Sequence, residues 1–536
     1  MATGKDMRAR TVTRRRLLGT AAAAGIGAVA SRWVAGTEVG GQAAAAAAPR
    51  RGGTLKVAEI GEPLTLDTAA TTADLTSTLT LGIFEELFAF DAGWRIQPAL
   101  VSSYNVSKDG LTYTFVLRNN ITFHNGAPVT PADVVASLAR WGKVSPRGVS
   151  VYAAVESVTT SGNDTVVMKM KTPFAALLSF LALPNGAAAI MPKEIAESAG
   201  TNPIKQFIGT GPYKLAEWAP DRYVHVVRFD QYVPRSESAS GYGGRKDALA
   251  DEVFYYPVSQ VETRIAGVQS GDYHIADGIN QDAYAQLKAD SRVDVGVIQP
   301  GSYLVFVFNT KQGVMSSLPL RQAVLVALDM QPIMQATFGN PALYSLDPSL
   351  YPKNTPWYTT AGSEWYNVHN VERAKQLAKE AGYSGQTIRW LSTQQYDYMF
   401  KSTVIASSQL QQVGLKVDLQ VMDWATVLDR RAKPDQWDMF VTSGGFVPDP
   451  ALQNIFGGAY PGWWSVPDKN RLFTAFNAEP DPAKRAKLWS QLHALWYSEA
   501  PVVRPGTFYN LVLSRRGLPG FKPSYWIVPW NVEVPK

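Results

Sequence analysis

The spacing of apolar residues predicts an early strand followed by a helix. In the stretch LTYTFVL, Leu111, Tyr113, Phe115 and Leu117 recur at every second position, and a period of two is typical of a strand with one buried face. Shortly afterwards, TPAD at 130–133 supplies an N-cap, a proline at the first helical position and an acid in the first turn. A helix should therefore follow, to about residue 141.

A second pattern, over residues 370–442, alternates strands and helices. Asn370 can cap a helix with apolar residues on one face that ends at Gly382. After it the sequence predicts strands at 387–392, 415–421 and 437–442, with helices at 400–414 and around 427. This order favours a parallel α/β unit. Because ligands bind at the carboxyl ends of such strands, the segments 391–396 and 442–450 are candidates for binding.

Composition indicates a folded protein of several domains. The 536 residues are 46% hydrophobic and 18% charged, and a domain usually takes about 150 residues. Residues 1–48 hold seven of the 51 basic residues and two of the 45 acids, so the remainder is nearly neutral, with 44 and 43. A nearly neutral body argues against nucleic-acid binding, which needs a concentrated positive charge.

The N-terminal residues resemble an export signal. Arg14, Arg15 and Arg16 precede Leu-Leu, a mild apolar run to Ala30 and a small-residue tract at 43–48, which together are typical of a cleaved signal peptide over residues 1–48. The adjacent arginines resemble a twin-arginine signal. The sequence has no cysteine, which excludes disulfides and lipid attachment through a cysteine. We therefore expect an exported, periplasmic protein that is not lipid-anchored.

The sequence lacks the minimum parts of common catalytic and metal sites. It contains no P-loop, HExxH or GxSxG motif, and its five histidines are widely scattered. We expect no metal, no cofactor and no catalytic residue. Among its 15 tryptophans, Trp463 and Trp464 lie in a loop-like stretch next to Pro461-Gly462, where a ring can face a ligand.

Several blocks of sequence resemble one known family, the dipeptide- and oligopeptide-binding proteins of ABC importers. They cover essentially the whole chain beyond residue 48: GGTL at 52–55, EPLTLD at 62–67, DGLTYTFVLRNNITFHNG at 109–126, PADVVASLAR at 131–140, GTGPYKLAEW at 209–218, PLRQAVLVALD at 319–329, RAKQLAKEAGY at 373–383 and SQLQQVGLKVDLQV at 408–421. The resemblance implies a class-C periplasmic-binding-protein fold, which is α/β with two hinged lobes and an extra inserted subdomain.

The resemblance also implies a division of the chain. Lobe I is discontinuous and would comprise residues 49–88, 208–300 and 505–536, with an inserted subdomain at 89–207. Lobe II would comprise 301–504, and the lobes would hinge near Gly301 and Pro505. The implied partners are a small-molecule ligand and the membrane permease subunits of an ABC importer, and we expect a monomer.

The sequence departs from this family at one functional position. Peptide-binding members place an acid about four positions before a proline in the segment that matches 437–450, and it pairs with the ligand's α-amine. Here Gly445 and Phe446 stand at that place, and Asp449 directly precedes Pro450. Since burying an unpaired amine is costly, either Asp449 or Glu62 would have to replace the acid.

The sequence supports ten candidate ligand-binding residues and three hypotheses about function. The first hypothesis is capture of a peptide-like or amino-acid-derived solute, either a short peptide or an opine-type conjugate. The second is an oligosaccharide-binding protein, for which Trp463 would stack on sugars, and a remote third is an exported enzyme. The candidate residues are Glu62, Thr393, Gln394, Tyr396, Ser443, Gly444, Gly445, Phe446, Asp449 and Trp463.

Overall fold

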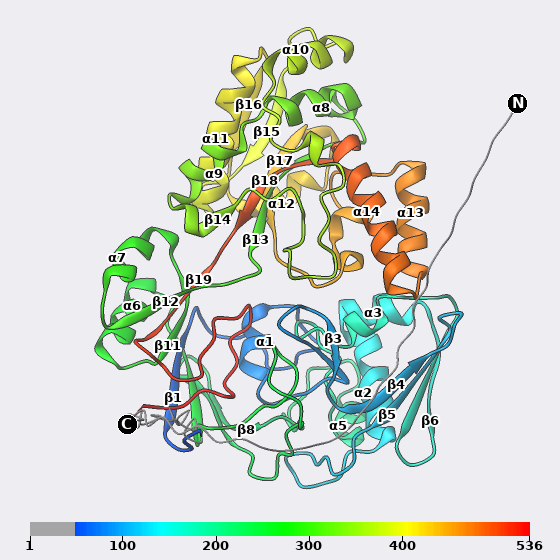
Figure 1. Cartoon of the computed structure of the whole chain (residues 1–536), viewed down its shortest axis with the longest axis vertical. Coiled ribbons are helices and arrows are strands. Elements are labelled where there is room, and N and C mark those ends of the chain that lie inside the picture. The colour runs from blue at the N-terminus through cyan, green and yellow to red at the C-terminus, as the bar shows by residue number, and fades with distance from the viewer. Residues whose placement is uncertain (1–48, 536) are drawn as a thin grey trace, which may run out of the picture. The chain divides into compact units, whose positions relative to one another are not determined.

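The structure, a computed structural model, describes residues 49–535. Four β-sheets of seven, six, four and two strands organise this part of the chain (Figure 1). None of the helices between residues 49 and 535 combines the length and the apolar character that a membrane crossing needs. The expected signal segment, residues 1–48, lies outside the described residues.

The seven-stranded sheet combines distant parts of the chain in the order β12-β19-β11-β1-β10-β9-β8. β1 pairs in parallel with β10 and β11, whereas β19 runs antiparallel between β11 and β12. The C-terminal strand therefore completes a sheet that begins near residue 54. The strands are β1 Thr54–Glu59, β8 Tyr213–Ala219, β9 Tyr223–Arg228, β10 Glu252–Pro257, β11 Ile275–Ile279, β12 Val293–Val297 and β19 Leu511–Arg515, and nearby helices are α1 Asp74–Thr80, α6 Val261–Ser270 and α7 Tyr284–Ala289.

The six-stranded sheet has the order β14-β18-β13-β17-β15-β16. β15 pairs in parallel with β16 and β17, which confirms the predicted parallel unit, but β13, β14 and β18 add antiparallel pairs. The strands are β13 Ser302–Phe308, β14 Tyr344–Ser345, β15 Ile388–Ser392, β16 Val417–Val421, β17 Met439–Gly444 and β18 Val502–Phe508. The helices are α8 Leu318–Ala327, α9 Met330–Phe338, α10 Val371–Glu380, α11 Asp397–Gln412, α12 Trp424–Arg431, α13 Pro467–Ala478 and α14 Pro482–Glu499.

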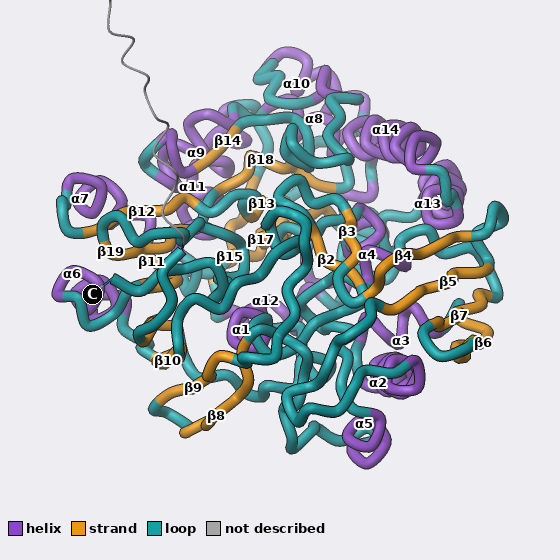
Figure 2. Tube along the Cα trace, turned by 60° about the horizontal axis from the view of Figure 1, so that its bottom comes forward, coloured by secondary structure: helices purple, strands orange, loops and turns teal. Residues whose placement is uncertain are grey.

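The four-stranded sheet, in the order β4-β5-β7-β6, contains the predicted alternating strand. Tyr113, Phe115 and Leu117 of β5 are buried, as the period of two predicts. The predicted helix α2 begins with a complete capping box between Thr130 and Asp133. Figure 2 shows α2 and α3 beside these strands. The bounds are β2 Phe88–Phe90, β3 Ile96–Pro98, β4 Val101–Val106, β5 Thr112–Leu117, β6 Val155–Ser161, β7 Thr165–Met170, α2 Pro131–Val144, α3 Pro146–Tyr152, α4 Leu177–Phe180 and α5 Lys193–Ala199.

Two short segments join the seven-stranded and six-stranded sheets. Residues 298–301 lead from β12 to β13, and residues 509–510 lead from β18 back to β19. Gly301, at the first crossing, is where the sequence places a hinge. Pro505 lies inside β18, which continues to Phe508, so the second crossing in the structure comes after the predicted position.

Candidate ligand-binding site

A cavity of about 240 Å³ lies between the six-stranded sheet and residues of α1, of the segment after α4 and of the C-terminal segment after β19. Asp74, Asn185 and Tyr525 line one side, and Tyr303 of β13 with the end of β17 lines the other. The predicted residues Ser443, Gly444, Gly445 and Phe446 all line this cavity.

A second cavity of about 320 Å³ shares Tyr303, Phe446 and Gln453 with the first. Tyr303 donates its hydroxyl to Gln453 Oε1 at 2.5 Å, and burial raises the pKa of Tyr303. The phenol therefore keeps its proton and can act as a neutral hydrogen-bonding group. Because the two cavities have these walls in common, we treat them as two compartments of one site.

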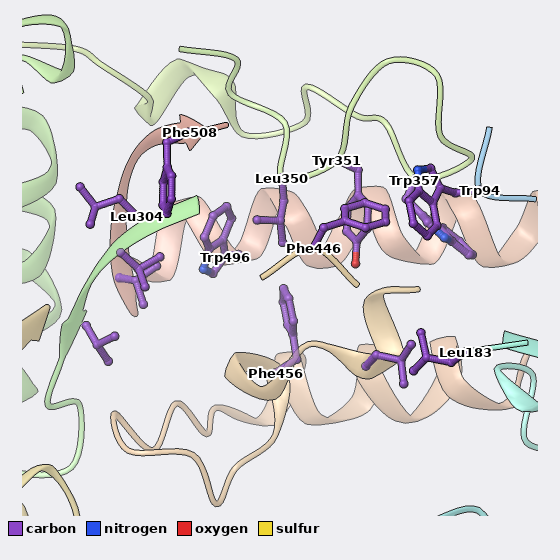
Figure 3. Packing of buried hydrophobic residues seen from close by; sticks show 14 of the residues in the cluster. Trp94, Leu183, Leu304, Leu350, Tyr351, Trp357, Phe446, Phe456, Trp496 and Phe508 are labelled. Carbon is purple, nitrogen blue, oxygen red and sulfur yellow. The ribbon is translucent and has the colours of Figure 1, made fainter. Parts of the chain in front are cut away.

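Phe446 is both packed and adjacent to the site. Its ring lies 4.5 Å from that of Trp94 and 6.0 Å from that of Tyr351, measured between ring centroids, and Figure 3 shows the three residues in one cluster. Its side chain is 7% exposed. It therefore closes the apolar wall of the site and belongs to the core at the same time.

The two glycines before Phe446 differ in what surrounds them. Gly444 is the last residue of β17, which continues two residues beyond the predicted strand 437–442. A Cβ there would come within 2.1 Å of the Tyr303 ring, so glycine permits the close approach of strand and ring. A Cβ at Gly445 would meet only the Tyr525 hydroxyl, in a tight contact of 3.0 Å, so a side chain there requires that hydroxyl to move by a few tenths of an ångström.

Sequence reasoning missed the polar group on the facing wall, which is centred on Asp74. Its Oδ1 accepts hydrogen bonds from Trp526 Nε1 at 2.8 Å and Asn185 Nδ2 at 3.1 Å, and Oδ2 accepts one from the Tyr525 hydroxyl at 3.3 Å. Burial raises the pKa of Tyr525, and the nearby Asp74 raises it further. The carboxylate is thus held by neutral donors.

Asp449 and Glu62, the predicted replacements for the missing acid, lie elsewhere. Asp449 is buried and forms a bidentate ion pair with Arg485, at 2.7 and 2.8 Å, and also accepts from Ser179 Oγ at 3.0 Å. Glu62 accepts a hydrogen bond from Trp218 Nε1 at 2.7 Å. Neither lines the two cavities, and the buried pair already neutralises Asp449.

The predicted residues after β15 also lie apart from the cavities. Thr393 is fully buried and Gln394 is exposed. The Tyr396 ring, 41% exposed, packs edge-on against Trp424. Further along, Tyr398 of α11 contacts β17 through a 2.9 Å hydrogen bond between its hydroxyl and Ser443 Oγ.

Trp463 is part of a separate aromatic cluster. Its ring centroid lies 5.6 Å from that of Trp437 and 5.5 Å from Lys311 Nζ. The space beside it measures about 10 Å³, which holds at most about one water molecule. Trp463 therefore does not face a ligand-sized cavity in this conformation.

The described residues offer no obvious place for a metal ion. Between residues 49 and 535, no three His, Asp or Glu side chains come together in a group that could hold one. The polar groups that line the two cavities are mainly hydroxyls and amides, together with the carboxylates of Asp74 and Asp347 and the ammonium group of Lys353. Such groups orient a bound solute.

Comparison with known proteins places the chain in a family. Residues 95–463 match the bacterial extracellular solute-binding proteins, family 5 middle. The chain belongs to this family and has the expected two-lobed α/β fold. Its members bind solutes for transport and are not enzymes, so its function is binding.

Individual relatives extend this comparison along the chain. The "probable peptide ABC transporter periplasmic-binding protein y4tO" of Sinorhizobium fredii is 28% identical over 499 residues, which cover 87% of this chain and 91% of the relative. The glutathione-binding protein GsiB of Salmonella typhimurium is 26% identical over 491 residues, with 87% and 90% covered.

Solved structures resemble the whole described fold. The periplasmic binding protein AgaA of A. tumefaciens R10, in complex with agropinic acid, is 27% identical with a TM-score of 0.69, and the match covers 90% of this chain and 99% of that one. The substrate-binding protein CtaP of Listeria monocytogenes has a TM-score of 0.79 at 20% identity, with 91% and 100% covered. The second likeness concerns the fold alone.

Proposed function

We propose that this protein captures a peptide-like or amino-acid-derived solute, either a short peptide or an opine-type conjugate, in the two adjoining cavities. The observation that carries the proposal is the polar and aromatic site between Asp74 and the end of β17. The proposal is also supported by relatives named for peptide and glutathione binding and by a structural relative in complex with agropinic acid.

The site residues proposed from the sequence are kept where the geometry supports them. Ser443, Gly444, Gly445 and Phe446 remain proposed contacts, and Tyr303, Gln453 and Asp74 join them because they line the same cavities. For the oligosaccharide alternative, Trp463 was the stacking residue, and its packing on Trp437 argues against that role.

The division into lobes is part of the proposal. Lobe I would contain the seven-stranded sheet and lobe II the six-stranded sheet, with 89–207 as the inserted subdomain. The sheet order supports this division, and the position of β18 moves the second boundary from 505 to 509–510. A ligand between the lobes would be enclosed when they close.

Export and delivery complete the proposal. The protein would leave the cytoplasm through its twin-arginine signal, act in the periplasm as a monomer without a lipid anchor, and deliver its solute to membrane permease subunits. Replacement of Arg14, Arg15 and Arg16 by lysine should abolish its appearance in the periplasmic fraction. Normal export of that variant would contradict the twin-arginine route.

A thermal-shift panel tests the ligand class. Short peptides, opine-type conjugates and oligosaccharides are each added to the purified protein over a range of concentrations. A ligand at 100 times its dissociation constant should stabilise the folded state by about 2.7 kcal/mol. We expect stabilisation by a member of the first two groups, and stabilisation by oligosaccharides alone would contradict the proposal.

A further inference from the structure

Asp74 is the only charged side chain among the described residues that line the first cavity. It lies in the first turn of α1 and is itself exposed. Within residues 49–535 no ion pair forms at its carboxylate, because its three hydrogen-bond donors are an indole, an amide and a phenol. The carboxylate is positioned by these donors but not neutralised by them.

Arg147 is a cation whose charge interacts with that of Asp74. Burial lowers the pKa of Arg147, and the attraction of Asp74 opposes that effect. However, Arg147 Nε donates to the backbone oxygen of Asn185 at 2.9 Å, and the side chain does not line the cavity. The cavity face of Asp74 therefore remains without a cationic partner.

Asn185 adds a second acceptor at the same wall. Its Nδ2 donates to Asp74, which fixes the amide orientation because a carboxylate can only accept. The other amide atom, Oδ1, is buried and has no hydrogen-bond partner within the described residues. A buried acceptor without a donor is costly, so a donor on the ligand would satisfy it.

From this geometry we infer that Asp74 and Asn185 receive the positively charged amino group of the solute, and that the protein selects ligands with a free amine. This inference rests on the proposed function and specifies its ligand class. An ammonium group carries up to three N–H donors, which can satisfy the carboxylate and the free amide oxygen together. Enclosure between the lobes strengthens the pairing, because removal of water leaves the charge with no other partner.

The opposite wall offers an independent way to supply the charge. Gly445 lies near Asp74, since a Cβ at 445 would be 3.0 Å from the Tyr525 hydroxyl, and this hydroxyl donates to Asp74 Oδ2 at 3.3 Å. The backbone at Gly445 lies outside the left-handed region, so its conformation admits an aspartate, provided that the Tyr525 hydroxyl moves by a few tenths of an ångström. A carboxylate at 445 should therefore replace one at 74.

The test compares the dipeptide Ala-Phe with its N-acetyl derivative by calorimetric titration of the full-length mature protein. We expect the wild type to prefer the free dipeptide. Asp74→Asn should lower the affinity for the free dipeptide by about tenfold to a hundredfold and change the affinity for the acetylated one little. The double variant Asp74→Asn/Gly445→Asp should regain the preference. Asp468→Asn, an exposed acid in the first turn of α13, serves as the matched control and should behave as wild type.

The outcomes separate the inference from the function on which it rests. If Asp74→Asn melts like the wild type and binds both peptides with an unchanged ratio of affinities, the inference is overturned while peptide binding stands. A wild type that prefers the acetylated peptide would also overturn the inference while peptide binding stands. If the wild type binds neither this peptide pair nor any compound of the thermal-shift panel, the proposed function fails and the inference with it.

Discussion

Phe446 packs directly against Trp94, with 4.5 Å between the ring centroids, and so joins the segment after β17 to the turn between β2 and β3. We predict that Phe446→Asp weakens the native ligand by about 1–3 kcal/mol. It should also lower the melting temperature, because the buried ring is replaced by a carboxylate without a partner. Ligands with a free amine should gain relative to N-blocked ones, since the new carboxylate lines the same cavity as Asp74.

Phe446→Leu is the control for this substitution. It keeps an apolar side chain and should retain most of the stability and the original ligand preference. Titration against one amine and one N-blocked analogue, together with a melting curve, distinguishes the effects. A stable Phe446→Asp protein with unchanged relative affinities would remove Phe446 from the site.

The buried ion pair of Asp449 and Arg485 should act on stability and not on ligand preference. Asp449→Asn removes the negative charge opposite the buried guanidinium of Arg485, and loss of the charged partner in a buried ion pair costs about 3–5 kcal/mol. Chemical denaturation measures this cost. The exposed pair of Asp468 and Arg471 is the comparison, because Asp468→Asn should cost less than about 1 kcal/mol. A large change in the ligand affinity ratio for a folded Asp449→Asn protein would contradict this assignment.

Glu86 should make stability fall as the pH rises. Burial raises its pKa from 4.5 to about 7, so between these values the folded protein keeps a proton that the unfolded chain has lost. The folded state is then penalised progressively, by about 3 kcal/mol above pH 7. Glu86→Gln should remove this contribution, and the difference in unfolding free energy between wild type and variant should grow from pH 4.5 to pH 7.

The exposed Glu372 on α10 provides the control for that measurement. Glu372→Gln should give a difference from wild type that stays nearly constant over the same pH range. The comparison between proteins is needed because buried histidines such as His493, whose pKa burial lowers to about 4, contribute a slope of opposite sign. A pH-independent difference for Glu86→Gln would contradict the prediction.

Ligand binding should close the lobes about the two crossings at 298–301 and 509–510. In the structure, Ser179 Oγ, in the proposed inserted subdomain, donates a hydrogen bond to Asp449 Oδ2, in the proposed lobe II, at 3.0 Å. Such a contact between the two lobes is expected for a closed state. Small-angle scattering should show a smaller radius of gyration at saturating ligand than without it. An unchanged scattering curve would contradict hinged closure.

Much of the fold can be predicted from local sequence patterns. The wall of the site formed by the end of β17 can also be predicted in this way, whereas the facing wall around Asp74 cannot. The period of two in β5 and the cap of α2 are local signals, and the structure has both. The strand-end argument located Ser443 to Phe446 at the cavity because β17 ends there. The same argument predicts the segment after β15 at the site, but in the structure its residues lie at the start of α11 and do not line the two cavities.

Asp74 and Tyr525 were missed for a different physical reason. They lie hundreds of residues apart, at the start of a short helix and in an irregular segment, so no periodicity relates them. The only local signal was an acid at the start of an apolar run, which is common at helix N-termini. The ion pair of Asp449 cannot be predicted from the neighbouring sequence, because its partner, Arg485, lies in α14, a separate element further along the chain.

The identity of the solute that the protein carries in the cell decides whether its function is capture of a peptide-like or amino-acid-derived compound. The protein is purified gently from the periplasm of cells grown in complex medium, weighed by native mass spectrometry, and unfolded to release what it holds. We predict one small molecule per chain, peptide-like or derived from an amino acid, whose mass accounts for the difference between the native and unfolded protein. A released oligosaccharide, or conversion of the solute to a product during incubation, would contradict the account.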